Sequence, residues 1–147
     1  MILISHRGNL NGRNAEEENR PDTIMKALDL GLQVEIDVWL HNNDLYLGHD
    51  EPTHKTSIDF ISQPNIWVHA KNKLVIPVLK KNKNVHWFWH ENDKVALTSK
   101  GYVWCFPGHE VECGIAVDAG QIIKNCLGVC SDNILAWSDH GRTHIIQ

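Results

Sequence analysis

The chain has 147 residues, of which 42% are hydrophobic and 22% are charged, and its formal net charge is −4. This length favours a single domain over residues 1–147 with a substantial buried core. The mild acidity argues against a general nucleic-acid binder, since no basic stripe is visible beyond residues 80–83. No apolar run approaches the roughly 20 residues of a membrane span, so no stable membrane insertion is expected.

The N-terminus and the cysteines indicate a cytoplasmic protein. The opening MILISHRG lacks a basic n-region and reaches His6 and Arg7 too early for a signal peptide. The four cysteines show neither CxxC spacing nor a dense secreted framework, which favours reduced thiols. A zinc site on Cys126 and Cys130 would lack a partner pair at finger spacing. The sequence gives no oligomeric state.

The predicted elements alternate between strands and helices along the chain. Pro21 and Asp22 suit the first turn of a helix that Gly31 ends. Pro77 kinks or shortens the helix expected around it. The expected strands are 2–5, 34–40 with its hairpin partner 45–47, 66–70, 85–89, the hairpin 95–98 and 102–106, 115–117 and 127–130, and the other expected helices are 57–61, 74–80 and 121–125.

Ionisable residues gather at the ends of these strands. Strands that alternate with helices favour a largely parallel sheet, in which sites form beyond the C-terminal strand ends. The residues at such ends are His6-Arg7, Glu35 and Asp37, His69 and Lys71, His90-Glu91, and Ser131-Asp132. A packed core does not select such residues, so the pattern indicates a functional site.

Two carboxylates in the second strand are the most specific part of this pattern. Glu35 and Asp37 are two residues apart, so they share one face of the strand, while Val34, Ile36 and Val38 share the other. Carboxylates side by side repel each other unless water, a cation or a basic group lies between them. A half-exposed strand with a solvated acidic face is the alternative explanation.

Several successive motifs carry a family resemblance. The runs Ile4-Ser5-His6-Arg7-Gly8, Glu18-Asn19, Glu35-Ile36-Asp37-Val38 and Gly48-His49-Asp50 resemble, in order and spacing, the motifs of glycerophosphodiester phosphodiesterases, within the phospholipase-C-like phosphodiesterases. The match covers roughly the first third of the chain, and Cys130-Ser131-Asp132-Asn133 is similar to the closing strand motif. Because the chain is shorter than usual members, the resemblance implies an α/β fold: a reduced or compact TIM-barrel-like fold with mostly parallel strands and one or two β-hairpins.

The resemblance also implies a reaction. It is the metal-dependent hydrolysis of a small glycerol- or polyol-containing phosphodiester, through a cyclic phosphate. His6 and His49 are implied as the acid/base pair, because both protonation states of imidazole are accessible near neutral pH. Arg7 and Lys71 are implied as phosphate ligands. The expected cation is Mg²⁺ or Ca²⁺, because both prefer carboxylate oxygens.

His69 is the departure from the family pattern. The family usually has a glutamate at this position, two residues before the phosphate-binding lysine, to complete the metal site. Histidine makes the site softer and less negative, which admits Mn²⁺, Zn²⁺ or Fe²⁺. The third ligand is either His69 or another carboxylate such as Glu91. Glu18, Asn19, His90 and Glu91 are expected to support the site by contacting the residues that bind the metal and the phosphate.

Alternatives remain at each position and for the whole chain. Taken singly, His6 and Arg7 could cap the sheet, His49 could be a surface turn residue and Lys71 a solvated lysine. His86, His90 and most tryptophans fit the core or its rim, although an indole could line a substrate cleft. The whole chain could also be an inactive member that binds a phosphorylated polyol, or a lyase-type relative that releases the cyclic phosphate.

Overall fold

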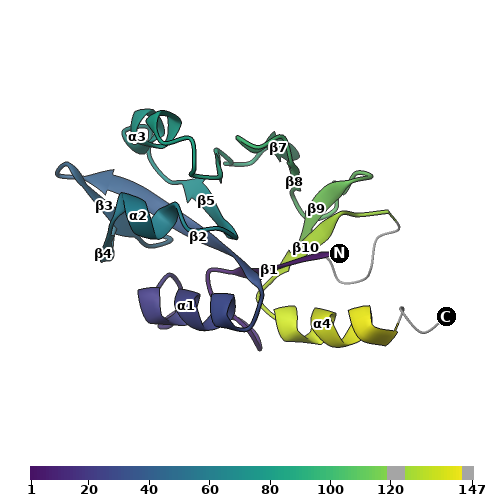
Figure 1. Cartoon of the computed structure of the whole chain (residues 1–147). Coiled ribbons are helices and arrows are strands. Elements are labelled where there is room, and N and C mark those ends of the chain that lie inside the picture. Colours follow the sequence, from purple (N-terminus) through teal and green to yellow (C-terminus); the bar gives the residue numbers. More distant parts are fainter. Residues whose placement is uncertain (119–124, 144–147) are drawn as a thin grey trace.

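The computed structural model describes residues 1–118 and 125–143 and shows one curled β-sheet with short helices packed against it (Figure 1). Within this described part, the sheet has ten strands and is accompanied by four helices. The elements are, in chain order, β1 (Ile2–His6), α1 (Pro21–Asp29), β2 (Gln33–His41), β3 (Asp44–Leu47), β4 (His54–Thr56), α2 (Ile58–Ile61), β5 (Ile66–Ala70), α3 (Val75–Lys81), β6 (Trp87–Phe88), β7 (Val95–Leu97), β8 (Val103–Cys105), β9 (Gly114–Val117), β10 (Gly128–Ser131) and α4 (Ile134–Thr143).

Strand β2 is the centre of the sheet, because it pairs with three other strands. Its first residues, as far as Glu35, pair in parallel with β1, and its last residues, from Val38 onward, pair with β3 in antiparallel orientation. Strand β5 pairs in parallel with the opposite edge of β2. The continuous strand order is β4-β3-β2-β1-β10-β9-β8-β7, with β6 attached to β5. Antiparallel pairs therefore flank a parallel middle.

The TIM-barrel prediction is wrong. The sheet is a curled half-barrel of mixed pairing, and its helices are few and short. Parallel strands need a crossover of about a dozen residues or more to accommodate a helix. The connections at residues 89–94 and 106–113 are shorter than this, and the first leads into the antiparallel hairpin of β7 and β8. Short loops thus replace the outer helices of a full α/β barrel.

Most of the individual elements were predicted correctly. The strands that became β1, β2, β3, β5, β9 and β10 lie within about two residues of the expected bounds, and so do helices α1, α2 and α3. The strand expected over 85–89 is reduced to Trp87–Phe88. Strand β4 and helix α4 were not predicted. The helix expected over 121–125 falls almost wholly outside the described residues.

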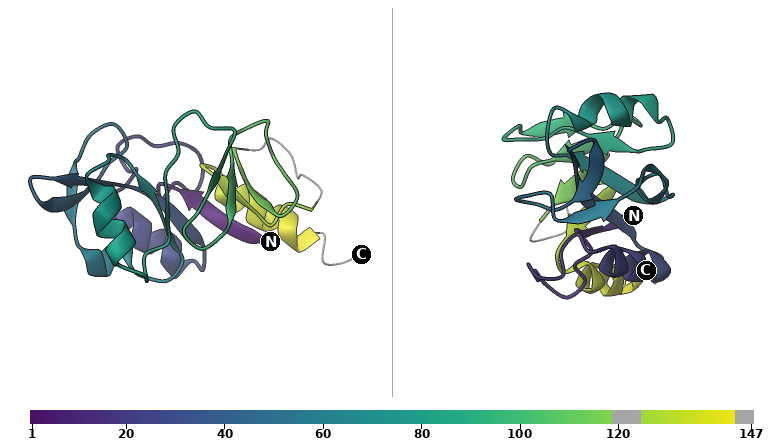
Figure 2. Two further views of the ribbon diagram at one scale, coloured as in Figure 1. Left: turned by 90° about the horizontal axis from the view of Figure 1, so that it is seen from above. Right: turned by 90° about the vertical axis from the view of Figure 1, so that its left-hand side faces the viewer.

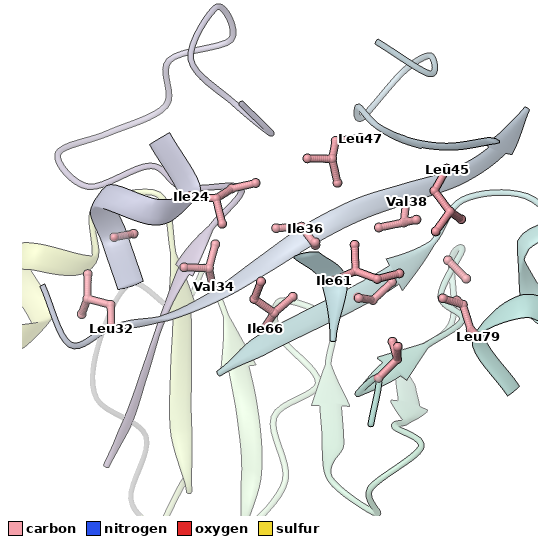
Figure 3. Packing of buried hydrophobic residues seen from close by; sticks show 14 of the residues in the cluster. Ile24, Leu32, Val34, Ile36, Val38, Leu45, Leu47, Ile61, Ile66 and Leu79 are labelled. Atoms are coloured by element: carbon pink, nitrogen blue, oxygen red, sulfur yellow. The ribbon is translucent and has the colours of Figure 1, made fainter. Parts of the chain in front are cut away.

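The two faces of the sheet carry two different cores. On the helix-covered face, the β2 side chains Val34, Ile36 and Val38 lie beside Ile24 of α1 and Ile61 of α2 (Figure 3). Each such buried side chain contributes about 1.5–3 kcal/mol of transfer free energy. Helices α1 and α4 lie on the same side of β1 and β10 (Figures 1 and 2). Because side chains alternate along a strand, Glu35 and Asp37 must face the opposite, concave side.

The concave side is filled by a smaller, aromatic-rich cluster. It consists of Ile4, Trp67, Phe88, Ala96, Trp104, Ile115, Val117 and Cys130. The ring of Trp104 lies 4.6 Å from that of Phe88 and 5.9 Å from that of Trp67, so β8 approaches β5 and β6 across the curl. None of the helices in the described residues is long and apolar enough to cross a membrane.

Candidate functional site

Register brings the predicted polar residues together on the concave face. His6 of β1 pairs with Glu35 of β2, and Asp37 of β2 pairs with His69 of β5. All four side chains therefore lie on neighbouring strands, directly beyond the aromatic cluster. His6, Glu35 and His69 line an open cavity of about 510 Å³ together with residues that include Arg7, His49, Lys71, Trp89, Glu91 and Asp118, while the Asp37 side chain is fully buried.

The shared edge of β2 explains why two loops reach this face. Strand β1 stops at His6, and the next residue donates its backbone N–H to the Glu35 carbonyl at 2.9 Å. One step further along, Gly48 donates to the Asp37 carbonyl at 3.2 Å as the chain leaves β3. At Gly48 φ is 155°, and a Cβ there would collide with the backbone oxygen of Glu51, so only glycine fits. This turn brings His49 to the cavity wall.

The Asp37 carboxylate is completely buried and is surrounded by polar and basic side chains. Asn19 donates its Nδ2 to Asp37 Oδ2 at 2.9 Å and accepts the Asp37 backbone N–H at 2.9 Å. Arg7 Nε lies 3.3 Å from Oδ2, and Lys71 Nζ lies 3.9 Å from Oδ1. Burial alone would raise the pKa of Asp37, but His69, Arg7 and Lys71 outweigh it and hold the pKa at about 2.

Glu35 is also buried, with 2% of its surface exposed, but it lacks comparable partners. Burial raises the pKa of Glu35, and the neighbouring Asp37 charge adds to the rise. Within the described residues, two buried oxygens have no hydrogen-bond partner: Glu35 Oε2 and Asp37 Oδ1. An unpaired buried carboxylate oxygen is costly unless a cation satisfies it. The donor set therefore fits a divalent metal ion.

His69 completes this set. Its Nδ1 lies 3.2 Å from Asp37 Oδ1, off the direction of a hydrogen bond, and 3.7 Å from Glu35 Oε1. Ligand atoms of Glu35, Asp37 and His69 all lie within 4.8 Å of one another. Glu91, the alternative third ligand, is exposed and does not belong to this group. Burial lowers the pKa of His69, but the two carboxylates outweigh it and the net shift is upward.

His6 is oriented by Asp132, which follows β10. The Nδ1 atom of His6 lies 2.8 Å from Asp132 Oδ1, and its Nε2 lies 3.7 Å from Glu35 Oε2. A carboxylate only accepts, so Nδ1 carries a proton and Nε2 faces the cavity. Burial lowers the pKa of His6, but Asp132 and Glu35 outweigh it and raise the pKa overall. This His–Asp pair resembles the orienting pair of many acid/base sites.

The expected supporting residues differ in what they contact. Glu18 accepts a hydrogen bond from Arg7 Nη1 at 3.2 Å and one from Asn9 Nδ2 at 3.2 Å, and so holds the loop that follows β1. Asn19 positions Asp37, as described above. His90 acts through its backbone, whose carbonyl accepts from His69 Nε2 at 2.8 Å, while the His90 ring stacks on Phe106. Glu18, Asn19 and His90 thus each form a hydrogen bond with a residue of the candidate site: Arg7, Asp37 and His69, respectively.

His49 stands on the cavity wall without contact to the carboxylate pair. Its Nδ1 lies 2.8 Å from Asp50 Oδ1, and the side chain is about one-third exposed. Burial and the nearby Arg7 charge lower the pKa of His49, in the opposite direction to His6. A bound substrate in the cavity would lie between these two histidines and the two basic residues, Arg7 and Lys71.

Three polar residues of the site escaped the sequence prediction. Asn9 donates to Asp132 Oδ1 at 2.8 Å and so links that carboxylate to Glu18. Asp132 was noted at a strand end but not assigned a role. Asp118 follows β9 in a left-handed conformation, with φ of 48°, and its carboxylate lies within 4.8 Å of ligand atoms of His6 and Asp132. Such strained residues concentrate at functional sites.

Comparisons with known proteins give no functional assignment. No protein-family model, curated protein or solved structure matches the chain. A functional interpretation therefore depends on the geometry of the cavity and on the motif resemblance.

Proposed function

We propose that this protein is a metal-dependent phosphodiesterase that cleaves a small glycerol- or polyol-containing phosphodiester by histidine acid/base catalysis. The observation that carries the proposal is the buried carboxylate pair, in which Glu35 Oε2 and Asp37 Oδ1 accept no hydrogen bond. The side chains beside these oxygens, His6, His69 and Lys71, line the open cavity. A structural ion pair would leave no such oxygens unsatisfied. The resemblance to glycerophosphodiester phosphodiesterases supports the same reaction class.

Glu35, Asp37 and His69 would hold the cation. The two carboxylates suit Mg²⁺ or Ca²⁺, and the imidazole admits Mn²⁺ or Zn²⁺. When bound, such an ion neutralises phosphoryl charge and polarises the phosphorus–oxygen bonds. Arg7 and Lys71 reach the same cavity and would bind the remaining phosphate oxygens.

His6 and His49 would move the protons. One imidazole accepts the proton of the attacking hydroxyl group, and the other donates a proton to the leaving oxygen. Attack by a neighbouring hydroxyl of the polyol gives a cyclic phosphate, which water then opens with the histidine roles exchanged. Asp132 keeps the His6 ring in one orientation and one tautomer, so that Nε2 stays directed at the cavity.

The test is turnover by purified, metal-stripped protein. A set of glycerophosphodiesters, each with a free hydroxyl next to the phosphodiester, is incubated with Mg²⁺, Ca²⁺, Mn²⁺ or Zn²⁺ added back. His6→Ala is compared with His41→Ala, which removes an exposed histidine at the far end of β2. We expect cation-dependent turnover that His6→Ala reduces by about 10²–10⁴-fold and His41→Ala leaves unchanged.

Product analysis separates the related reactions. Phosphorus NMR distinguishes a hydrolysed monoester from a cyclic phosphate, which a lyase-type enzyme would release. A second candidate is a phospho-polyol-binding protein without turnover, and the observation that favours it is the replacement of the usual glutamate by His69. Folded protein that binds cations but cleaves no diester with any ion would contradict the enzyme proposal.

A further inference from the structure

We propose that the cation centre coordinates through Nδ1 of His69 and therefore selects Mn²⁺ or Zn²⁺ over Mg²⁺ and Ca²⁺. This inference rests on the metal centre of the proposed function and narrows it. It depends on three features: the tautomer of His69, the fixed orientation of its ring, and the charge of the ligand set.

The tautomer follows from one hydrogen bond. His69 Nε2 lies 2.8 Å from the backbone carbonyl oxygen of His90. A carbonyl oxygen only accepts hydrogen bonds, so Nε2 must carry a proton. In the neutral ring the lone pair is then on Nδ1, the atom that faces Asp37 and Glu35. Metal-binding histidines are oriented in the same way, with the second nitrogen donating to a carbonyl or carboxylate.

The ring of His69 is held in this orientation by packing. It stacks on Phe88 with ring centroids 5.1 Å apart and an angle of 7° between the planes. The two residues are register partners on β5 and β6, so the stack is part of the sheet. The imidazole nitrogen, Asp37 Oδ1 and Glu35 Oε1 thus converge without a change of backbone. Coordination at about 2.0–2.2 Å needs only a small inward movement of these atoms.

The charge of the site disfavours hard cations. An imidazole in place of a third carboxylate leaves two formal negative charges, Glu35 and Asp37. Arg7 Nε at 3.3 Å and Lys71 Nζ at 3.9 Å from Asp37 reduce the negative potential further. Mg²⁺ and Ca²⁺ bind almost entirely through charge on oxygen, whereas Mn²⁺ and Zn²⁺ also bind nitrogen donors well. The loss of negative charge therefore weakens Mg²⁺ and Ca²⁺ more.

The experiment compares cation binding in the absence of substrate. Metal-stripped wild-type protein and His69→Glu are titrated with Mn²⁺, Zn²⁺, Mg²⁺ and Ca²⁺ by calorimetry. Any oxygen site prefers Mn²⁺ to Mg²⁺ to some degree, so the measured quantity is the change in that preference. We expect the ratio of Mg²⁺ to Mn²⁺ dissociation constants to fall at least about tenfold in His69→Glu, because the glutamate restores an oxygen-only, more negative site.

A spectroscopic measurement tests the ligand directly. Electron spin-echo modulation of bound Mn²⁺ reports a coordinated ¹⁴N nucleus. We expect this modulation in wild-type protein and in His6→Gln, which removes the imidazole that lies 3.7 Å from Glu35 Oε2, and its loss in His69→Glu. The wild-type and His6→Gln spectra together decide the question even if His69→Glu does not fold.

The outcomes separate the inference from the proposed function. Cation binding without ¹⁴N modulation, or with an unchanged Mg²⁺ to Mn²⁺ ratio in folded His69→Glu, would overturn the inference and leave the metal centre standing. No binding of any of the four cations to wild-type protein would overturn the centre itself, and the inference with it.

Discussion

The concave face of the sheet has a closed end and an open end, built from the same strands. At the closed end, Trp67 and Trp104 pack against each other in a dry aromatic cluster. At the open end, Glu35 and His69 line the cavity, and their ligand atoms lie within 4.8 Å of those of the buried Asp37. A step of two residues along β5, from Trp67 to His69, leads from one end to the other. Core and site therefore differ only in which side chains the same backbone presents.

One histidine at each end shows what this difference does. His86 at the closed end is buried, packs against Trp67 with the two ring planes tilted by 45°, and contacts Thr98 Oγ1 at 2.7 Å. Burial and the Lys100 charge lower the pKa of His86 to about 4. His69 is largely buried as well, but Asp37 and Glu35 raise its pKa. Burial therefore favours the neutral ring at both ends, and only the carboxylates beside His69 reverse the direction of the pKa shift.

The largest effect is expected from breaking the closed end. Trp104→Ala should lower the free energy of unfolding by about 3–5 kcal/mol, because it empties the centre of the aromatic cluster. Urea unfolding followed by circular dichroism measures this loss. Leu97→Ala is the control on the neighbouring strand, since Leu97 is 73% exposed and should cost less than about 0.5 kcal/mol. Equal losses for the two variants would show that the cluster does not stabilise the curl.

The next prediction uses pH to separate the two ends. Because the folded pKa of His86 is about 4 and its unfolded value is about 6.5, the unfolded state binds more protons between these pH values. This histidine should therefore lower the free energy of unfolding, by up to about 3 kcal/mol, as pH falls from 6.5 to 4. His6 and His69 have raised pKa values, so their contributions have the opposite sign and are lost as pH rises.

The variant that isolates this effect is His86→Gln, whose amide can still reach Thr98. Unfolding free energies of both proteins are measured at pH 7 and pH 4.5. The advantage of wild-type protein over His86→Gln should shrink on acidification. A constant difference would mean that His86 titrates in the folded protein as it does in the unfolded chain.

At the open end, Asp132→Asn tests whether Asp132 positions His6 and holds its proton. The substitution keeps the size of the side chain but removes the anion that holds the Nδ1 proton. We expect kcat to fall about 100-fold while KM changes little. The limb of the pH–rate profile that reports His6 should also move to lower pH, because the variant imidazolium has lost its partner. A loss of kcat without that shift would indicate a structural role only.

The smallest expected effect is a gain of stability. Glu35→Gln removes a buried charge that lacks a hydrogen-bond partner on Oε2, and should raise the unfolding free energy of metal-stripped protein by about 1 kcal/mol. Thermal unfolding in EDTA, with the exposed Glu16→Gln as control, measures this gain. With cation at about 100 times its dissociation constant, wild type should gain about 2.7 kcal/mol and the order should reverse. Destabilisation in EDTA would contradict a site built for a cation.

The sequence revealed local features well and distant partners poorly. Alternation along β2 predicts that Glu35 and Asp37 share a face, and register then brings His6 and His69 to them. The contact between His6 and Asp132 joins residues 126 positions apart, and no local pattern signals it. Strand β4 is polar at an edge of the sheet, so it lacks the hydrophobic alternation of a strand signal.

The prediction of the fold class was wrong for a related reason. The motifs of the first third were extended to the whole chain, and they implied a reduced or compact TIM-barrel-like fold with mostly parallel strands. Helices between parallel strands need chain length, and residues 89–94 and 106–113 do not provide it. What the motifs specify is the site-bearing edge formed by β1 and β2. The remaining strands complete the curled sheet with a mixture of parallel and antiparallel pairs.

The pairing of β1 with β10 also sets the order in which the candidate site can assemble. Ile2 of β1 pairs with Gly128 of β10. One edge of β1 pairs with β2, but the other edge stays unpaired until β10 has been synthesised. Contacts of such sequence separation form late in folding, because a long loop must close first. A chain emerging from the ribosome would carry Glu35 and Asp37 long before Asp132 is present to orient His6. The His6–Asp132 contact therefore cannot form until most of the described chain has been synthesised.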